Sequence, residues 1–130
     1  MLTALGLMSG TSLDGVDAAL LHTDGERILA FGETAYRPYS AADRETIRAA
    51  LGRWPGEPGV AEAAEVVETA HAAVMAPLAA RAEIAGFHGQ TLAHDPAGRR
   101  THQAGDGQVL AEVLGLPVVW DFRSADMRLG

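Results

Sequence analysis

The sequence predicts an α/β fold in which a mixed sheet carries N-terminal β-hairpins and is flanked by helices. Short apolar segments separated by turn signals fill residues 3–36, two helical stretches follow, and the remainder alternates strand-like and helical segments. This order is typical of an α/β sheet with antiparallel strands at one edge. The length of 130 residues suits one domain or part of one.

The first three predicted strands are antiparallel neighbours. Residues 3–8 form a short apolar run, and residues 15–22 form a second one after a polar turn at residues 9–15. The Asp-Gly pair at residues 24–25 is typical of a tight hairpin and leads into a third strand at about residues 27–36. Two successive hairpins are therefore expected at the start of the chain.

Two helices are predicted next. One begins at Ser40 and ends at Gly52, and a longer one begins at about Val60. Pro77 lies inside the longer helix and is expected to kink or divide it, because its ring clashes with the preceding turn. We expect His71 to be an interior histidine with its hydrogen bonds satisfied. The predicted inner stripe of this helix consists of Val60, Ala64, Val67, His71, Val74 and Leu78.

The remaining segments alternate strands with one helix. Residues 84–87 predict a buried strand that ends in the polar residues 88–91, and a loop at residues 95–100 leads to a short strand at about residues 101–104. A helix then ends at Gly115 and Pro117. Its apolar face consists of Val109, Leu110, Val113 and Leu114. The last predicted strand, residues 118–120, ends abruptly in Asp121, Phe122 and Arg123.

Composition excludes several classes of site. All ten basic residues are arginines, so the chain has no Walker-type phosphate loop, Schiff-base lysine or Ser-Lys dyad. Without cysteine there is no disulfide, thiolate metal site or cysteine nucleophile. The net charge of −7 argues against binding nucleic acid. No apolar run reaches the ~20 residues of a membrane span and no signal peptide is evident, so we expect a soluble cytoplasmic chain.

Three polar clusters follow predicted strands, where ligands bind in open α/β sheets. They are residues 9–15, 88–91 and 121–123. The first is rich in small residues and hydroxyls, which suits an anion such as phosphate, although a plain hydrogen-bonded hairpin turn has the same composition. Asp14 and Asp17 could hold Mg²⁺ through water or simply cap the turn.

The other two clusters leave alternatives open. His88 is flanked by Gly89, which lets a ligand approach, but a lone histidine is more often structural than catalytic. Asp121 and Arg123 could orient a sugar or phosphate, or form a structural ion pair. A hydrolase that uses Ser12, His88 and Asp121 lacks the second glycine of a nucleophile elbow. The remaining histidines show no metal-ligand spacing and no metal is assigned to them: His22, His94 and His102.

Four motifs along the chain carry a family resemblance. The first is Gly-Leu-Met-Ser-Gly-Thr-Ser-Leu-Asp-Gly-Val-Asp at residues 6–17. The others are Gly-Phe-His-Gly-Gln-Thr at 86–91, Gln-Ala-Gly-Asp at 103–106 with Leu-Ala-Glu at 110–112, and Val-Val-Trp-Asp-Phe-Arg-Ser-Ala-Asp at 118–126. In order and spacing they resemble the anhydro-N-acetylmuramic acid kinase family over nearly the whole chain.

The resemblance implies a ribonuclease-H-like lobe of the actin and sugar-kinase superfamily, with ATP and Mg²⁺ as cofactors. In that fold the hairpin between the first two strands wraps the phosphates of ATP. The implied ATP-binding residues are Gly10, Thr11, Ser12, Leu13, Asp14, Gly15, Val16 and Asp17. On the sugar side of the cleft we expect His88, Gln90, Asp121 and Arg123. Many superfamily relatives anchor the metal with an Asp where this chain has Met8, so no metal ligand is assigned.

The resemblance also implies an activity. The family uses ATP and water to open and phosphorylate 1,6-anhydro-N-acetylmuramic acid, giving N-acetylmuramic acid 6-phosphate for cell-wall recycling. Its general-base Asp lies in an Asp-x-Gly-Pro-Gly-Asn segment beyond residue 130, so residues 1–130 are expected to be an incomplete N-terminal ATPase-type lobe, inactive alone and without the C-terminal lobe. The alternative is a non-catalytic sugar- or nucleotide-binding module, or a half-enzyme that needs a separate second lobe. The uncovered surface of a half-fold predicts self-association as a homo-oligomer.

Overall fold

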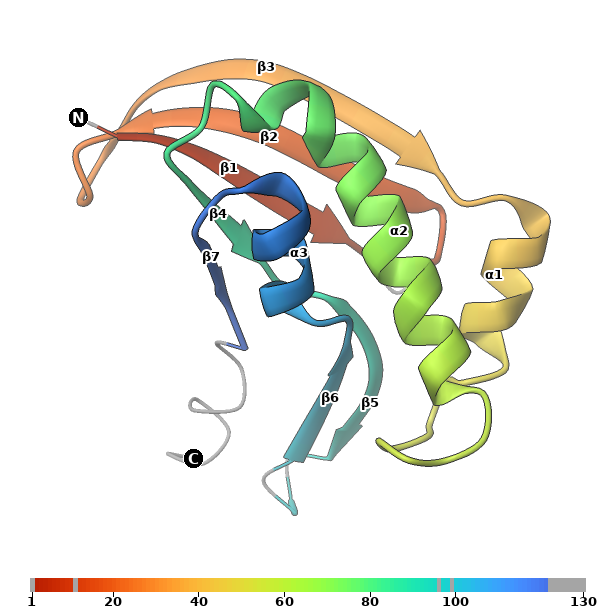
Figure 1. Ribbon diagram of the computed structural model, residues 1–130. Helices are drawn as coiled ribbons and strands as arrows, with labels where there is room; N and C mark the ends of the chain where they lie inside the picture. The colour runs from red at the N-terminus through yellow and green to blue at the C-terminus, as the bar shows by residue number, and fades with distance from the viewer. Residues whose placement is uncertain (1, 11, 96, 99, 122–130) are drawn as a thin grey trace.

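A five-stranded mixed sheet forms the centre of the computed structural model, with strand order β3-β2-β1-β4-β7 (Figure 1). The structure describes residues 2–10, 12–95, 97–98 and 100–121. The elements are β1 (Leu2–Ser9), β2 (Gly15–Thr23), β3 (Ile28–Pro38), α1 (Ala41–Arg48), α2 (Val60–Ala79), β4 (Ile84–Phe87), β5 (Gln90–Asp95), β6 (Arg100–Ala104), α3 (Gly107–Leu114) and β7 (Val118–Trp120). The predicted α/β class and mixed sheet are confirmed.

The first three strands pair as the hairpin signals predict. β1 is antiparallel to β2 and β2 is antiparallel to β3, whereas β4 is parallel to both β1 and β7. The parallel strands β1, β4 and β7 therefore end at one edge of the sheet, which is where α/β proteins bind their ligands.

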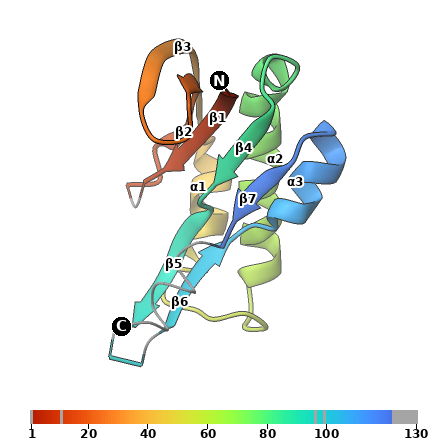
Figure 2. The same ribbon diagram turned by 90° about the vertical axis from the view of Figure 1, so that its left-hand side faces the viewer.

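Helices α2 and α3 lie on one face of this sheet, and α1 packs beside α2 (Figures 1 and 2). Inward side chains such as Leu5, Val16 and Phe87 meet buried residues of α2, including Val67 and Met75, in one core. Strand side chains alternate between faces, so every second residue of β1, β2 and β4 points away from these helices. In the described part of the chain, no helix covers that second face (Figure 2).

Helix α1 begins where the sequence predicts and ends earlier. Ser40 is its N-cap, and the Ser40 Oγ accepts a hydrogen bond from the backbone N–H of Asp43 at 3.0 Å. The predicted end at Gly52 is wrong by one turn, because after Arg48 the backbone bonds from Ala50 and Leu51 reach back three residues instead of four.

Helix α2 runs through Pro77 without interruption. The prediction that Pro77 could divide the helix is wrong: α2 continues to Ala79, with the proline in its last turn. The inner stripe is confirmed except for Ala64, which is only half-buried while its neighbour Ala63 is buried. The buried residues of α2 are Val60, Ala63, Val67, Ala70, His71, Val74, Met75 and Leu78.

One strand was not predicted. The sequence predicts a polar segment at residues 88–91 and a loop from residue 95, yet residues 90–95 form β5, which pairs with β6 in a separate two-stranded sheet. This strand buries Gln90, Leu92 and Ala93. Because Gln90 is polar, it interrupts the pattern of apolar residues from which a buried strand is predicted. Gly89, with φ of +80°, makes the turn from β4 into β5. No helix among the described residues is long and apolar enough to cross a membrane.

Candidate functional site

Two of the three predicted polar clusters are hydrogen-bonded to each other at the carboxyl ends of β1 and β4. The Ser9 Oγ donates to the carbonyl oxygen of Gly89 at 3.3 Å, and the Gln90 Nε2 donates to the carbonyl oxygen of Gly10 at 3.0 Å. Because β1 and β4 are parallel neighbours, the turn after β1 and the turn after β4 form one continuous polar edge.

The turn between β1 and β2 is anchored to the core by an apolar side chain. The backbone N–H of Leu13 donates to the carbonyl oxygen of Gly10 at 3.2 Å, and the Leu13 side chain is buried in the core. Leu13 has φ of 60°, an uncommon conformation for a leucine. Ser12 and Asp14 remain exposed. The turn thus presents Ser12 and Asp14 to solvent above a buried leucine, while Thr11 lies outside the described residues.

The start of β2 fixes the other end of this turn. The backbone N–H of Tyr39 donates to the carbonyl oxygen of Asp14 at 2.9 Å. A Cβ at Gly15 would collide with the carbonyl oxygen of Arg37, so the close approach of β3 requires a glycine there. The Val16 side chain is buried in the core and Asp17 is exposed. Of these predicted ATP-binding residues, Val16 and Gly15 can contribute only through their backbone.

At the end of β4, His88 belongs to a side-chain network. Its Nε2 lies 3.1 Å from the Nε2 of Gln103, which also donates to the Oγ1 of Thr91 at 2.8 Å. The Gln103 Oε1 accepts from the Oγ1 of Thr101 at 2.8 Å. Gln103 belongs to one of the sequence motifs, but the motif alone indicates no role for it. The available signal was the polar alternation of Thr101 and Gln103 in a short strand next to the site.

Gln90 is fully buried and its amide is directed at the turn. The Nε2 binds Gly10, whereas the Oε1 has no hydrogen-bond partner in the described part of the chain. Gln90 therefore joins the two halves of the polar edge and has little surface to offer a sugar. Its predicted place on the sugar side remains a prediction.

The third cluster follows β7, the outer parallel strand. Asp121 is exposed and has φ of 59°, in a region that Asp tolerates better than most residues. Trp120 packs over the start of α3, where a Cβ at Gly107 would lie 2.6 Å from the Trp120 Cδ1. This contact fixes the end of β7 beside β4. Arg123, the other predicted residue of this cluster, lies outside the described residues.

Two further histidines are structural. His71 is buried as predicted: its Nδ1 donates to the carbonyl oxygen of Val67 at 2.7 Å, and its ring meets Phe87 edge-on at 4.8 Å. Burial lowers the pKa of His71 to about 4, so the ring is neutral. Its hydrogen bonding is only half satisfied, because the Nε2 has no partner among the described residues. His102 donates through Nδ1 to the carbonyl oxygen of Arg53 at 2.7 Å.

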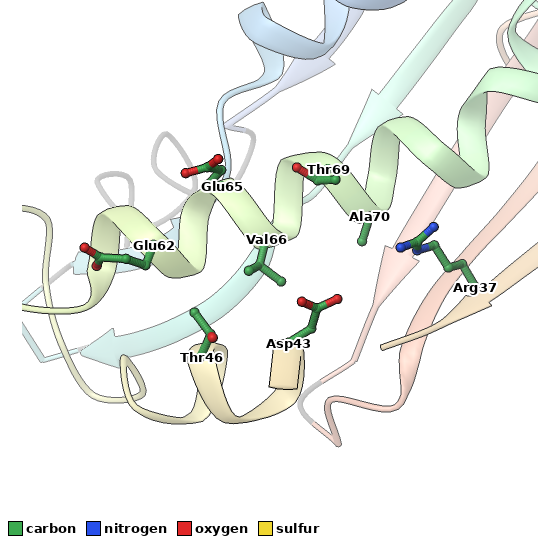
Figure 3. A pocket seen from close by; sticks show the side chains of 8 residues that line it. All are labelled: Arg37, Asp43, Thr46, Glu62, Glu65, Val66, Thr69 and Ala70. Carbon is green, nitrogen blue, oxygen red and sulfur yellow. The ribbon is translucent and has the colours of Figure 1, made fainter. Parts of the chain in front are cut away.

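A cavity of about 350 Å³ lies between α1 and α2, on a different part of the molecule (Figure 3). None of the predicted site residues lines it. It is lined by Arg37, Asp43, Thr46, Glu62, Glu65, Val66, Thr69 and Ala70. The carboxylates make it a poor phosphate site, so the polar edge at the ends of β1, β4 and β7 remains the candidate functional site. Within the described residues no group of three or more His, Asp or Glu side chains could hold a metal ion.

The fold defines an α/β protein. At its polar edge a hairpin turn rich in small residues lies beside the ends of parallel strands, an arrangement suited to a phosphate-bearing ligand. Residues 2–130 match the family model described as anhydro-N-acetylmuramic acid kinase. The chain belongs to this family.

Individual relatives support the same assignment. The chain is 72% identical over 127 residues to the anhydro-N-acetylmuramic acid kinase of Cereibacter sphaeroides, which covers 98% of this chain and 34% of the relative. It is 63% identical to the enzyme of that name from Ruegeria sp. and 62% identical to anhydro-N-acetylmuramic acid kinase 1 from Jannaschia sp., each over 98% of this chain. The alignments cover 33% of the Ruegeria protein and 34% of the Jannaschia protein, so the chain spans about one third of the length of these curated relatives.

Proposed function

We propose that this chain is the N-terminal ATPase-type lobe, with a ribonuclease-H-like fold, of a cytoplasmic sugar kinase that acts in peptidoglycan recycling. The reaction consumes ATP, water and 1,6-anhydro-N-acetylmuramic acid and yields ADP and N-acetylmuramic acid 6-phosphate. The observation that carries the proposal is the Gln90–Gly10 hydrogen bond, because it joins the hairpin turn to the end of β4 in one edge. Family membership supplies the chemistry.

The turn after β1 is the proposed phosphate site. Ser12 and Asp14 expose polar side chains here, and the conformation of the turn is held by Leu13 and by the Tyr39–Asp14 hydrogen bond, so a phosphate would meet a preorganised backbone. The residues proposed to bind ATP are Gly10, Thr11, Ser12, Leu13, Asp14, Gly15, Val16 and Asp17. Gly15 and Val16 would act through their backbone groups.

Exposed carboxylates suit Mg²⁺ at this turn. Asp14 and Asp17 are both exposed, and Mg²⁺ commonly keeps several waters while it bridges a carboxylate and the nucleotide phosphates. When bound, Mg²⁺ would screen phosphate charge. The chain's own part is to position the phosphates.

The ends of β4 and β7 form the proposed sugar side. His88 and Asp121 lie at these ends, and Arg123 would follow them in the chain. A donor imidazole, a carboxylate and a guanidinium are suited to the hydroxyl, acetamide and carboxylate groups of an amino sugar acid. Gln90 would act here mainly by holding the turn. The general base of the family would come from outside these 130 residues.

A chimeric enzyme tests the proposal. Replacing the matching third of the Cereibacter sphaeroides relative with this chain should give a protein that phosphorylates the anhydro sugar with ATP, because the two are 72% identical there. The Asp14→Asn and Asp17→Asn forms should raise the Mg²⁺ concentration needed for half-maximal rate, whereas Glu112→Gln on the exposed side of α3 should not. A folded but inactive chimera would overturn the proposal.

The isolated chain separates this function from a free-standing binding module. We expect it to show no ATP-dependent phosphorylation of the sugar by itself. Saturable calorimetric binding of ATP-Mg²⁺ or of the sugar, in the absence of turnover, would favour the module or half-enzyme. Turnover by the 130-residue chain would contradict the expectation that it is inactive alone.

A further inference from the structure

We propose that Arg44 is the cationic side chain of the phosphate site at the turn after β1, where its guanidinium donates hydrogen bonds to a phosphate oxygen. The ligand that it would take is the polyphosphate chain of a nucleotide. The inference rests on the proposed function in one respect, namely that this turn is the phosphate site. It goes beyond that function because Arg44 lies on α1, outside residues 10–17.

The turn has no positive charge of its own. Its charged side chains are the exposed carboxylates of Asp14 and Asp17, which would repel a polyphosphate in the absence of a cation. Because the chain has no lysine, the positive side chain of a phosphate site in this lobe has to be an arginine. Two arginines follow the turn closely in the fold, Arg37 at the end of β3 and Arg44 on α1.

Tyr39 connects Arg44 to the turn. The Arg44 Nη2 donates to the carbonyl oxygen of Tyr39 at 3.3 Å, and the backbone N–H of Tyr39 donates to the carbonyl oxygen of Asp14 at 2.9 Å. The Tyr39 side chain is buried in the core, so the residue that joins the two groups is itself fixed. The guanidinium is therefore held beside the residue that closes the turn.

The Arg44 guanidinium has donors to spare. It carries five N–H groups, and among the described residues the carbonyl oxygen of Tyr39 is its hydrogen-bond acceptor. The Nε is buried and has no partner in this part of the chain. Arg44 as a whole is only half-buried, which leaves part of its surface accessible. A partly desolvated cation without an anion is unfavourable, and a bound phosphate would remove that cost.

No carboxylate within the described ranges forms an ion pair with Arg44. The acidic residues of α1 lie elsewhere, because Glu45 pairs with Arg48 and Asp43 lines the cavity between α1 and α2. Arg37 also lines that cavity, together with three carboxylates, so its charge is directed away from the turn (Figure 3). Four other arginines have carboxylate partners: Arg27, Arg48, Arg81 and Arg100. Arg44 is therefore the arginine near the turn that is open to an anionic ligand.

NMR of the arginine side chains tests the inference on the isolated chain. During a titration with inorganic triphosphate and Mg²⁺ at millimolar concentration, the Nε–H signal of Arg44 should shift together with the backbone amides of Ser12 and Asp14. The Arg44 signal is assigned by its absence from the Arg44→Gln spectrum. Arg44→Gln should require a roughly 3- to 10-fold higher triphosphate concentration for the same shift of the turn amides. Arg44→Lys keeps the charge and should recover part of that loss.

Two further arginines provide matched controls, because each variant removes the same charge without removing the proposed contact. Arg48→Gln lies one turn further along α1, and Arg37→Gln faces the cavity between α1 and α2. Both should leave the triphosphate titration unchanged within about 2-fold, since solvent and salt screen charges that make no direct contact. Equal losses in Arg37→Gln and Arg44→Gln would mean that net charge alone matters, which would overturn the inference.

Separate signals of the unmodified chain report on the two proposals, even if a variant does not fold. If the turn amides shift and the Arg44 Nε–H does not, the inference is overturned and the phosphate turn stands. If the turn amides do not respond to triphosphate, the proposed phosphate site fails and the inference fails with it. N-acetylmuramic acid, which has a carboxylate and no phosphate, is the comparison ligand. An Arg44 signal that responds to this sugar and not to triphosphate would also overturn the inference.

Discussion

The side-chain amide of Gln90 donates a hydrogen bond to the carbonyl oxygen of Gly10 over 3.0 Å, although the two residues lie 80 positions apart in the sequence. Gly10 also accepts the backbone bond from Leu13 that closes the turn after β1. One carbonyl group thus joins the turn to β5, the strand that continues from β4 through Gly89. The shape of the proposed phosphate site depends on a residue that the sequence motif places in a different cluster.

Replacing Gln90 tests this connection. Gln90→Leu leaves the Gly10 carbonyl without its second donor, and we expect a loss of about 1 kcal/mol in the free energy of unfolding, at the low end for a buried hydrogen bond because the variant also removes the unpartnered Oε1. Urea denaturation measures the loss. Gln108→Leu on the exposed side of α3 should change stability by less than about 0.5 kcal/mol. Equal stability of the two variants would show that the Gln90–Gly10 contact contributes nothing.

Gly89 tests the close approach of β4 to the β5–β6 hairpin. Its φ is +80°, and an added Cβ would lie 2.6 Å from the carbonyl oxygen of Ala104. Gly89→Ala should therefore destabilise the chain by about 3 kcal/mol or more, since the strained backbone and the steric clash add.

Gly25 provides the matched control for that variant. It has φ of +96° with no atom within 4 Å of an added Cβ, so Gly25→Ala isolates the backbone cost of about 1–2 kcal/mol. The difference between the two alanine variants measures the clash. If thermal or urea unfolding gives the same loss for both, the packing of Gly89 against Ala104 is not tight.

Local sequence patterns predict most of the strands and helices of this fold. The features that they miss depend on contacts between residues distant in sequence. The Asp-Gly pair of the second hairpin and the Ser40 cap are signals within four residues, and both features are present. β5 was missed because Gln90 is a polar residue in a buried strand position, stabilised by Gly10, which is distant in sequence. The position of Pro77 in the last turn of α2 likewise depends on where the helix ends, which local periodicity fixes poorly.

The same distinction applies to the candidate site. The polar clusters could be located from the ends of predicted strands, because parallel strands share an edge. The contacts of Gln103 could not be inferred, because Thr91 is brought to it by β5, the strand that was not predicted, and His88 by the turn at Gly89 that leads into β5.

The uncovered face of the sheet predicts self-association of the isolated chain. By strand register this face carries Met8, Leu21, Phe31, Tyr36 and Val119. Phe31 is 75% exposed and Met8 is 67% exposed. Apolar surface of this kind usually marks an interface, so light scattering should show a mass above 13.6 kDa that rises with concentration.

A charge on this face should oppose the association. Phe31→Glu and Met8→Glu should shift the mass toward that of the monomer, because a buried unpaired carboxylate is costly. Leu51→Glu is the control, since Leu51 is 43% exposed on the turn after α1 and away from the sheet face. A monodisperse monomer at all concentrations would contradict the prediction.

His71 predicts how stability depends on pH. Burial lowers the pKa of His71 from 6.5 to about 4 in the folded chain, so between these values the unfolded chain binds a proton that the folded chain does not. Stability is therefore complete above pH 6.5 and is lost as the pH falls toward 4. Between pH 7 and pH 5 this group should remove about 2 kcal/mol from the free energy of unfolding. In His71→Leu, urea denaturation at the two pH values should show a dependence smaller by that amount. An unchanged dependence in His71→Leu would mean that the buried ring does not set the pH dependence.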